Sequence, residues 1–369
     1  KNWKDIFFNK NNNLNNFTYN NNFKLERKSK KISKYEVNQN ILYENGNFIT
    51  SDSNGNLLIY STENNNFSHK FNFYKKKYKK IKKKLNIIVE ENIVYVSDNI
   101  GFMYAYDYVR KKIIWAKNFK VPFRSNLKII KNNLAAANQN NNLYIIDKNS
   151  GGNLKLIPTE ETIIKNNFIN NLSTDGKNLY FLNTYGSLYS IDIDSKRINW
   201  FINLNQSLEL NPSNLFIGNQ IVLQNSKIVV SSNNFTYVLD SKNGSIIYKK
   251  NFSSLLKPII NNDYLFLISK NNLLISMDLR NGKILFSYDL NGEISNFLGS
   301  KKKVAKFRNI ALINDGLLIF LKNSYILQLS VNGKIQRIVK LPSKINTHPI
   351  FIKNQILFAD NNNKITVMN

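Results

Sequence analysis

The sequence predicts an all-β protein, an eight-bladed β-propeller built from four-stranded antiparallel blades. Three observations predict this fold: a phrase that recurs along the chain, strands that alternate with period two, and chain ends that complement each other. The phrase is a Gly or Asn turn, an alternating strand that usually ends at an Asp, a polar turn, and a strand carrying an aromatic residue. Clear copies lie at residues 101–115, 186–200, 235–248 and 274–286.

The copies are evenly spaced. The last residue of the alternating strand marks each copy, and the markers lie about 44 residues apart, within the roughly 40–50 residues of a propeller blade. Eight copies predict eight blades, and seven is the alternative if the copy at Ser61 or Ser330 is degenerate. The markers are Ser61, Asp107, Asp147, Asp192, Asp240, Asp278, Ser330 and Asn369.

Each repeat holds four short strands. A second apolar run precedes each marker strand, as at 93–97 and 179–182, and a further run usually lies upstream, as at 258–260. Asn, Asp, Gly and Ser separate these runs and favour tight turns. Helical periodicity is not evident over a useful length. The longest interval, which contains Lys301–Lys303, predicts an elaborated surface loop.

The two chain ends are expected to share one blade. The last repeat stops at Asn369, directly after its third strand, so residues 17–25 are expected to supply the fourth. Closure of this kind removes exposed sheet edges, which otherwise invite aggregation. We therefore expect residues 1–16 to form an Asn-rich N-terminal tail and residues 17–369 to form a single propeller domain.

Composition excludes several classes of function. Of the 369 residues, 42% are apolar and 12% aromatic, which excludes a wholly disordered chain. The count of Cys is 0, which excludes disulfide frameworks, iron–sulfur clusters and cysteine nucleophiles, and the 2 His leave little material for metal or acid–base sites. Lys and Arg total 52 against 24 Asp and Glu, a formal charge of +28 that favours anionic surfaces.

The recurring Asp and aromatic residues have a structural interpretation. An Asp after a strand accepts hydrogen bonds from the backbone of the next turn, and an aromatic residue on the following strand can pack between blades. We therefore assign structural rather than ligand-binding roles to these residues. They are Asp107, Trp115, Asp147, Asp192, Trp200, Asp240 and Asp278.

The candidate catalytic and metal motifs are incomplete. Asp192 and Asp194 lack the Gly, the third ligand and the distant Glu of a calcium loop. His69 and His348 lie far apart in the sequence and have no acidic neighbour within three residues. The sequence also lacks nucleophile-elbow and phosphate-loop motifs. We predict no catalytic residue, no metal ligand and no cofactor site.

A lysine run is the most conspicuous local feature. It should join the first blade to the second, and it has three interpretations: a patch for anionic lipid headgroups, a nucleic-acid site with Tyr74 and Tyr78 stacking on bases, or a solvated loop enriched by codon bias. We consider nucleic acid the less favoured of the two ligands. The lysines are Lys75, Lys76, Lys77, Lys79, Lys80, Lys82, Lys83 and Lys84.

The repeat resembles that of pyrroloquinoline-quinone (PQQ) type β-propellers. The best matches to the pattern Tyr-Ala-x-Asp…Gly-Lys-x-x-Trp are residues 104–115 and 278–286, and the resemblance covers about residues 41–369. A single-domain chain of this length that ends on a third strand resembles the BamB family of outer-membrane protein assembly factors. The resemblance implies a non-catalytic periplasmic scaffold, associated with the outer membrane and monomeric by itself, that binds a barrel-assembly subunit through inter-blade loops.

The resemblance also implies candidate contact residues. Phe123 and Arg124 lie in the link from the second to the third blade, and the position of Arg124 resembles an arginine-bearing strand of family members. An ordinary strand start is the alternative. Such proteins are commonly lipid-anchored at a Cys, which the given chain lacks. The alternative function is a PQQ-dependent dehydrogenase or another ligand-binding propeller, although those enzymes resemble this repeat in much longer, cysteine-containing chains.

Overall fold

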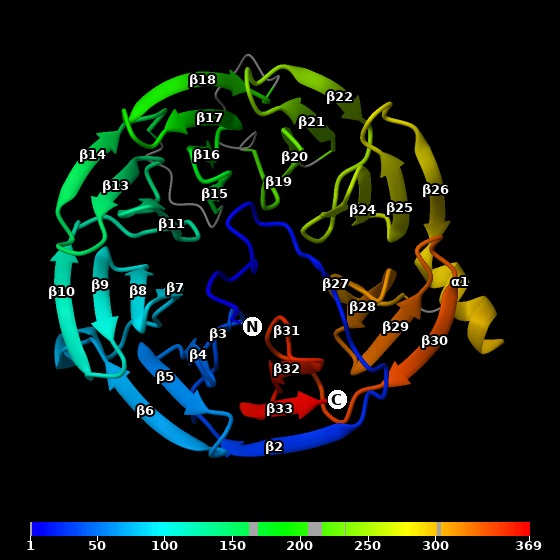
Figure 1. The fold of residues 1–369 in the computed structure, drawn as a ribbon, viewed down its shortest axis with the longest axis horizontal. Helices are drawn as coiled ribbons and strands as arrows, with labels where there is room; N and C mark the ends of the chain where they lie inside the picture. Colours follow the sequence, from blue (N-terminus) through cyan, green and yellow to red (C-terminus); the bar gives the residue numbers. More distant parts are fainter. Residues whose placement is uncertain (1, 162–168, 206–215, 233, 301–303) are drawn as a thin grey trace.

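Eight four-stranded antiparallel sheets are arranged around a central axis in the computed structural model, which describes residues 2–161, 169–205, 216–232, 234–300 and 304–369 (Figure 1). The sheets follow one another around the ring in chain order, each running from an inner strand to an outer strand. This arrangement confirms the predicted eight-bladed β-propeller. The seventh blade carries a fifth strand, β1 (Asn16–Phe17), which pairs in parallel with its inner strand.

The two inner positions of each blade are built from buried, largely apolar strands. These strands are short and apolar on both faces because the neighbouring blades cover both sides of each sheet. The innermost strands are β3 (Leu42–Glu44), β7 (Leu85–Glu90), β11 (Lys128–Ile130), β15 (Asn171–Thr174), β19 (Val222–Gln224), β23 (Ile259–Asn261), β27 (Phe307–Ile313) and β31 (Ile350–Ile352). The second strands are β4 (Asn47–Ser51), β8 (Ile93–Asp98), β12 (Asn133–Ala137), β16 (Asn178–Leu182), β20 (Lys227–Ser231), β24 (Tyr264–Ile268), β28 (Gly316–Leu321) and β32 (Gln355–Ala359).

The two outer positions carry the recurring phrase of the sequence. The outermost strands are mostly exposed because only one edge and part of their faces meet the rest of the protein. The third strands are β5 (Asn56–Ser61), β9 (Phe102–Asp107), β13 (Leu143–Asp147), β17 (Ser187–Asp192), β21 (Thr236–Asp240), β25 (Leu273–Asp278), β29 (Tyr325–Leu329) and β33 (Lys364–Met368). The outermost strands are β6 (Asn66–Asn72), β10 (Lys112–Asn118), β14 (Asn153–Ile157), β18 (Arg197–Asn203), β22 (Ile246–Lys250), β26 (Ile284–Asp289), β30 (Ile335–Lys340) and β2 (Leu25–Lys31).

The ring is closed by an N-terminal strand, as the sequence predicts, but the strand lies further along the chain than expected. Strand β2 pairs antiparallel with β33 and completes the eighth blade. It begins at Leu25, where the predicted segment 17–25 ends. The displacement has a physical cause, since residues 3–17 lie along the inner strands and the residues that follow carry the chain outward to the rim, where Arg337 on β30 donates to the Asn21 carbonyl (Figure 1).

Residues 3–17 follow the inner strands around the axis instead of projecting as a tail. Backbone hydrogen bonds join Trp3 to Tyr43 in both directions, at 2.7 and 2.8 Å, and the Val89 N–H donates to the Lys4 carbonyl. Further along, the Thr174 N–H donates to the Lys10 carbonyl. The Leu223 N–H in turn donates to the Asn11 carbonyl, so backbone hydrogen bonds join this segment to the first, second, fourth and fifth blades.

Asparagine side chains add hydrogen bonds to the fourth and fifth blades and extend the contact to the sixth. The Asn12 Nδ2 donates to the carbonyls of Leu172 and Ile221, each at 2.8 Å. The Asn13 side chain both donates to the Ile260 carbonyl and accepts from the Ile260 N–H. Because an Asn amide carries a donor and an acceptor like a peptide group, it can satisfy inner-strand edges that have no neighbouring strand.

Helix content is small. Among the described residues, the helix α1 (Leu290–Leu298) and the 3₁₀ turn η1 (Lys76–Tyr78) both lie in links between blades. Asp289 caps α1 by accepting from the Asn291 N–H, and Gly299 ends it in the left-handed conformation. The sequence does not predict this helix, because nine residues are too few for a clear helical period. Within the described ranges, no helix is both long and apolar enough to span a bilayer.

Candidate interaction face

Each outermost strand ends, and the next innermost strand begins, on the same face of the ring, because every blade has the same antiparallel strand order. The turns between second and third strands reach that face too, and isolated bridges join links to turns, as in Phe123 with Asn138 and Ile345 with Asp360. We call this face of the ring the link face. The opposite face carries the remaining hairpin turns, and we call it the turn face.

The lysine run lies on the link face between the first and second blades. Lys83 differs from the rest, since its side chain is buried and its Nζ donates to the Tyr78 carbonyl at 2.6 Å. Lys82 pairs with Glu36 at 2.6 Å in an exposed ion pair. The exposed lysines are Lys75, Lys76, Lys77, Lys79, Lys80, Lys82 and Lys84.

Aromatic side chains anchor this run to the second blade. The Tyr74 hydroxyl donates to Asp98 Oδ2 at 2.6 Å, and burial together with the Asp98 charge raises the pKa of Tyr74 well above its usual value. The Tyr78 ring meets Phe102 edge-on at 5.6 Å. Both tyrosines are thus used in packing, and the lysines around them project from a fixed segment.

The lysine run and Arg124 flank the same turn. Asn99 donates to the Lys82 carbonyl at 3.0 Å and accepts from the Lys84 N–H at 2.8 Å, while the Phe123 N–H donates to the Asp98 carbonyl. Burial and the nearby positive charge of Arg124 lower the pKa of Lys84. The structure therefore brings two sites predicted separately into one basic surface.

The two predicted contact residues differ in accessibility. Phe123 is 2% exposed, and its ring packs edge-on against Phe119 and Tyr144 at 5.3 and 5.8 Å, so the expectation that it is an exposed contact is wrong. Its apolar ring fills the space between the second and third blades. Arg124 is partly exposed, and its guanidinium has no hydrogen-bond partner among the described residues. Its role in partner binding stays a prediction.

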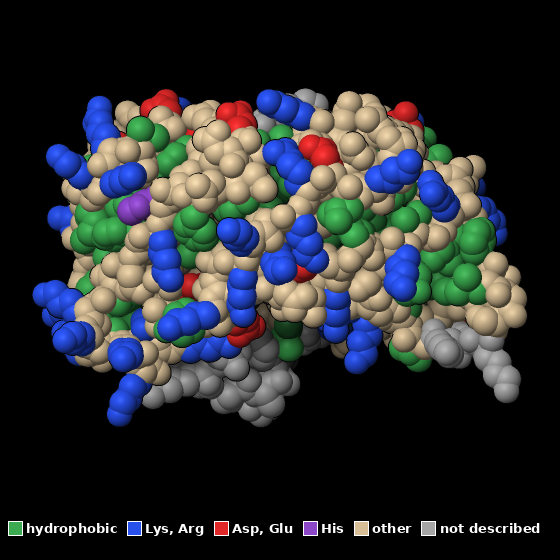
Figure 2. Space-filling view, turned by 90° about the horizontal axis from the view of Figure 1, so that it is seen from below, with side chains coloured by type: hydrophobic (Ala, Val, Ile, Leu, Met, Phe, Trp, Pro, Cys, Tyr) green, Lys and Arg blue, Asp and Glu red, His purple; other side chains and the backbone are tan. Residues whose placement is uncertain are grey.

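Exposed apolar groups lie in the link between the sixth and seventh blades. Phe297 and Leu298 at the end of α1 are 47% and 56% exposed, and Val304 is 77% exposed. This helix is the elaborated loop that the sequence predicts, and the lysines Lys301–Lys303 lie outside the described residues. Basic and apolar groups are therefore both present on the link face. From the side, Lys and Arg visibly outnumber Asp and Glu (Figure 2).

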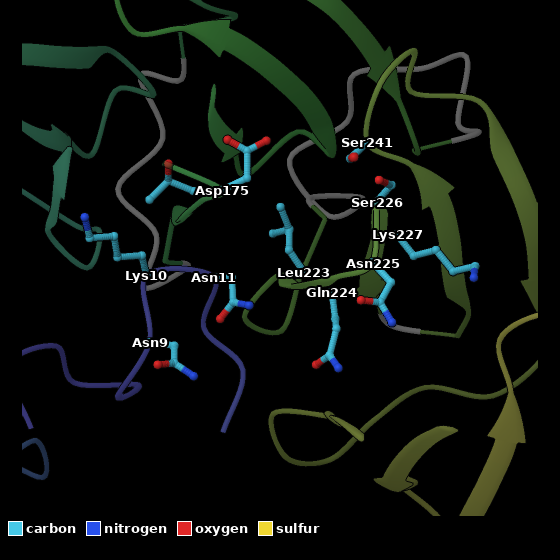
Figure 3. A pocket seen from close by; sticks show the side chains of 11 residues that line it. Asn9, Lys10, Asn11, Asp175, Leu223, Gln224, Asn225, Ser226, Lys227 and Ser241 are labelled. Atoms are coloured by element: carbon cyan, nitrogen blue, oxygen red, sulfur yellow. The ribbon is translucent and has the colours of Figure 1, made fainter. Parts of the chain in front are cut away.

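A polar pocket of about 540 Å³ opens between the fourth and fifth blades at the turn face (Figure 3). Asn9, Lys10 and Asn11 form one wall, and Asp175 and Lys227 contribute the other charges. Asp175 already accepts hydrogen bonds from Asn178 and Tyr180. No local sequence pattern reveals this pocket, because its walls come from four separate segments of the chain.

The recurring Asp residues cap the outer hairpins. Asp107 Oδ1 accepts from the N–H groups of Val109 and Arg110, and Asp147 Oδ1 accepts from that of Ser150 at 2.7 Å. Asp192 and Asp240 make equivalent contacts with Ser195 and Lys242. Asp278 adds a bidentate interaction with Arg280, whose hydrogen bonds lower the Asp278 pKa to about 2.

The two repeat tryptophans join neighbouring blades. Trp115 on β10 donates its indole N–H to the Lys148 carbonyl of the third blade at 2.8 Å. Trp200 on β18 makes the corresponding bond to Ser241 of the fifth blade at 3.1 Å. A Cβ on Gly151 would lie 2.6 Å from the Trp115 ring, so this hairpin needs Gly for the close approach as well as for its positive φ of +69°.

Neither histidine lies in a metal-ligand cluster. The His69 ring contacts the Tyr106 hydroxyl at 2.5 Å, and burial followed by the charge of Lys111 lowers its pKa. Within the part of the chain that the structure describes, no group of three His, Cys, Asp or Glu is placed to hold a metal ion.

A group of basic residues near the axis was missed by the sequence analysis. Lys128, Lys257, Arg308 and His348 come from the third, sixth, seventh and eighth blades, so no local pattern connects them. A calcium-bound quinone needs several converging oxygen ligands. Here the axial charges are mainly cationic, and the carboxylate of Asp5 is already paired with Lys128, so these residues do not fit that group.

The closed ring, the capped hairpins and the aromatic inter-blade contacts define an eight-bladed β-propeller of PQQ-type repeats. A family model described as outer membrane protein assembly factor BamB matches residues 83–288, more than half of the chain. The chain therefore belongs to the BamB family. No curated protein sequence matches it.

Solved structures agree with this fold at low sequence identity. BamB from Moraxella catarrhalis has a TM-score of 0.72 and 13% identity, covering 92% of this chain and 99% of that chain. Quinohemoprotein alcohol dehydrogenase from Comamonas testosteroni has a TM-score of 0.75 and 10% identity, covering 100% and 80%. The computationally designed Ika8 protein has a TM-score of 0.68 and 10% identity, covering 92% and 99%. These likenesses concern the fold alone.

Proposed function

We propose that this protein is a non-catalytic scaffold subunit in outer-membrane β-barrel assembly, acting in the periplasm at the outer membrane. Membership of the BamB family is the observation that carries the proposal. In this role the propeller is a monomeric docking platform that binds a barrel-assembly subunit, and the rigid ring holds its loops at fixed spacing.

The link face is the proposed docking surface. It presents the partly exposed Arg124 beside the lysine run, and exposed Phe297 and Leu298 on α1. Arginine and aromatic side chains are enriched among residues that dominate interface energies. A basic surface also accelerates association with an acidic partner. The chemistry of this face thus suits a protein partner that offers acidic and apolar groups.

Site-specific photo-crosslinking tests the proposal. A crosslinking amino acid is placed at Arg124 or Phe297 on the link face, and at the exposed Lys131 or Lys353 on the turn face as matched controls. In envelope extracts of the source organism we expect link-face probes to capture an outer-membrane barrel-assembly protein. Capture from the turn face alone, or recovery of cytosolic RNA-associated proteins alone, would contradict the proposal.

The enzyme hypothesis has a separate test. The Comamonas testosteroni neighbour is a quinohemoprotein alcohol dehydrogenase, which makes a PQQ-dependent dehydrogenase the alternative function. We propose that this chain lacks such activity, because its axial groups do not suit a metal-bound quinone. Purified protein with added PQQ and calcium is therefore expected to keep its melting temperature and to reduce no dye. A clear rise in melting temperature together with dye reduction would favour the dehydrogenase function over the scaffold function.

A further inference from the structure

Two of the basic residues near the axis surround a single aromatic ring. The Nζ atoms of Lys128 and Lys257 lie 5.7 and 5.9 Å from the centre of the Phe7 ring. Phe7 belongs to the N-terminal segment inside the propeller, so both ammonium groups are directed toward that segment. Lys128 is fully buried on β11, and Lys257 lies just before β23.

Two further basic residues extend the group toward the link face. Arg308 lies on β27 and His348 lies just before β31, in the seventh and eighth blades. The charges of Arg308 and Lys257 both act on the His348 ring. We call Lys128, Lys257, Arg308 and His348 the axial cation cluster.

The positive charge of this cluster is only partly balanced. Asp5 Oδ2 lies 2.6 Å from Lys128 Nζ and supplies one negative charge. Lys257 Nζ donates to the Asn12 carbonyl at 2.7 Å, and Arg308 donates to the Asn346 carbonyl at 2.5 Å. Carbonyl groups satisfy a hydrogen bond without cancelling a charge. Among the described residues, Asp5 is the carboxylate that acts on these lysines, and none acts on Arg308 or His348.

The lowered pKa values of Lys257 and His348 reflect this excess of positive charge. Burial, reinforced by the charge of Lys128, lowers the pKa of Lys257 to about 7. Burial, reinforced by Arg308 and Lys257, lowers the pKa of His348 to about 4. A buried charge without a counter-charge is costly, and a group lowers that cost by losing its proton. A bound anion would remove the cost in a different way.

The cluster lies next to solvent-exposed surface, although the Lys257 ammonium and the His348 ring are themselves buried. Lys257, Arg308 and His348 each keep part of their surface exposed, whereas Lys128 is fully enclosed. The Arg308 Nε is buried and has no hydrogen-bond partner in the described structure. A guanidinium donor of this kind is well suited to an oxyanion.

We infer that the axial cation cluster is a binding site for one small oxyanion, of the size of sulfate, phosphate or a carboxylate group. Lys257 and Arg308 contact the anion directly, and the Lys128–Asp5 pair closes the site on the side of the N-terminal segment. His348 lies beside the anion, so the anion's negative charge should change the pKa and the ring signals of His348. This inference is independent of the proposed scaffold function, since it concerns the axis and not the loops.

The test uses sulfate, whose charge is constant from pH 6 to 9, added to the purified full chain at constant ionic strength with chloride as replacement. Calorimetry is expected to show saturable binding at one site. Because the chain has 2 His, NMR can follow each ring separately. Sulfate is expected to raise the His348 pKa and shift its ring signals, while those of His69 stay in place. An arm with acetate shows whether a carboxylate binds too.

Substitutions locate the site. Lys257→Met or Arg308→Met is expected to weaken sulfate binding at least tenfold, whereas Lys344→Met, an exposed lysine in the link that also contains His348, is expected to have no effect. Equal sulfate binding by all three variants would overturn the inference. So would wild-type His348 NMR signals that do not shift when sulfate is added. The wild-type NMR experiment decides the question even if a variant fails to fold.

Discussion

The Nζ of Lys128 lies 2.6 Å from Oδ2 of Asp5, which joins the inner strand of the third blade to a segment more than a hundred residues earlier in the chain. Lys128 is 0% exposed and the Asp5 side chain is 7% exposed. This buried ion pair holds the N-terminal segment at the axis, where it contacts the inner strands.

Asp5→Asn is expected to lower the free energy of unfolding by about 3–5 kcal/mol, because it leaves a buried ammonium without its counter-charge. Replacing both partners by Asp5→Leu and Lys128→Met should recover much of the loss. Urea unfolding measures the free energy of unfolding of the single and the double variant. As the control, Asp194→Asn removes an exposed partner of Lys131 and should cost less than about 1 kcal/mol. If Asp5→Asn and Asp194→Asn lowered the free energy of unfolding equally, the buried ion pair would contribute no more to stability than the exposed one.

Contact between Trp115 and Gly151 is expected to be a measurable part of blade packing. Gly151→Ala should destabilise the protein by about 2–4 kcal/mol, because it combines a positive φ with a clash against the indole. In the Trp115→Ala background the clash disappears, so the same substitution should cost about 1–2 kcal/mol. Thermal unfolding of the four proteins in this double-mutant cycle provides the measurement. Additive effects would contradict the contact.

Lys257 is expected to make stability depend on pH in the alkaline range. Its pKa is about 7 in the folded protein against 10.5 ordinarily, so between these values the unfolded chain binds more protons and stability rises with pH. Below pH 7 the full penalty is present. Lys257→Met should therefore be about 1–3 kcal/mol more stable than the wild type near pH 7, and the difference should vanish toward pH 10.

Urea unfolding at several pH values between 7 and 10 checks this expectation. The groups facing Lys257 are Lys128, Asp5 and His348, of which His348 has a pKa near 4 and does not titrate in this range. Lys128 is present in both proteins, so its direct contribution largely cancels in the difference. A stability difference that stays constant across the range would show that Lys257 titrates normally.

Binding of the lysine run to anionic vesicles is expected to be electrostatic. Changing Lys75, Lys76 and Lys77 to Gln should weaken binding to phosphatidylglycerol vesicles by about 1 kcal/mol per lysine at low salt, and the effect should shrink as salt rises. Vesicle sedimentation measures the change. Lys131→Gln with Lys353→Gln, on the turn face, is the matched control. If the run is only a solvated loop, the two sets of variants will behave alike.

Local sequence patterns predict much of the fold. Asp107 and Trp115 recur with their neighbours because every blade needs the same hairpin and the same contact with the next blade, so period, blade number and closure are predictable. Phe123 shows the limit of this approach, since neither its burial nor the site of the closing strand β2 follows from a repeat. Both depend on which apolar groups the neighbouring segments already cover.

From its sequence alone, this protein is an eight-bladed propeller of PQQ-type repeats, because strand alternation and turn residues act over a few positions and repeat regularly. The path of Asn12 and Asn13 along the inner strands, and the meeting of Lys128, Lys257, Arg308 and His348 from four blades, were decided by the tertiary structure. Ring closure brings inner strands from distant parts of the chain to a common axis. There, free strand edges and unbalanced charges must find partners that no local pattern specifies.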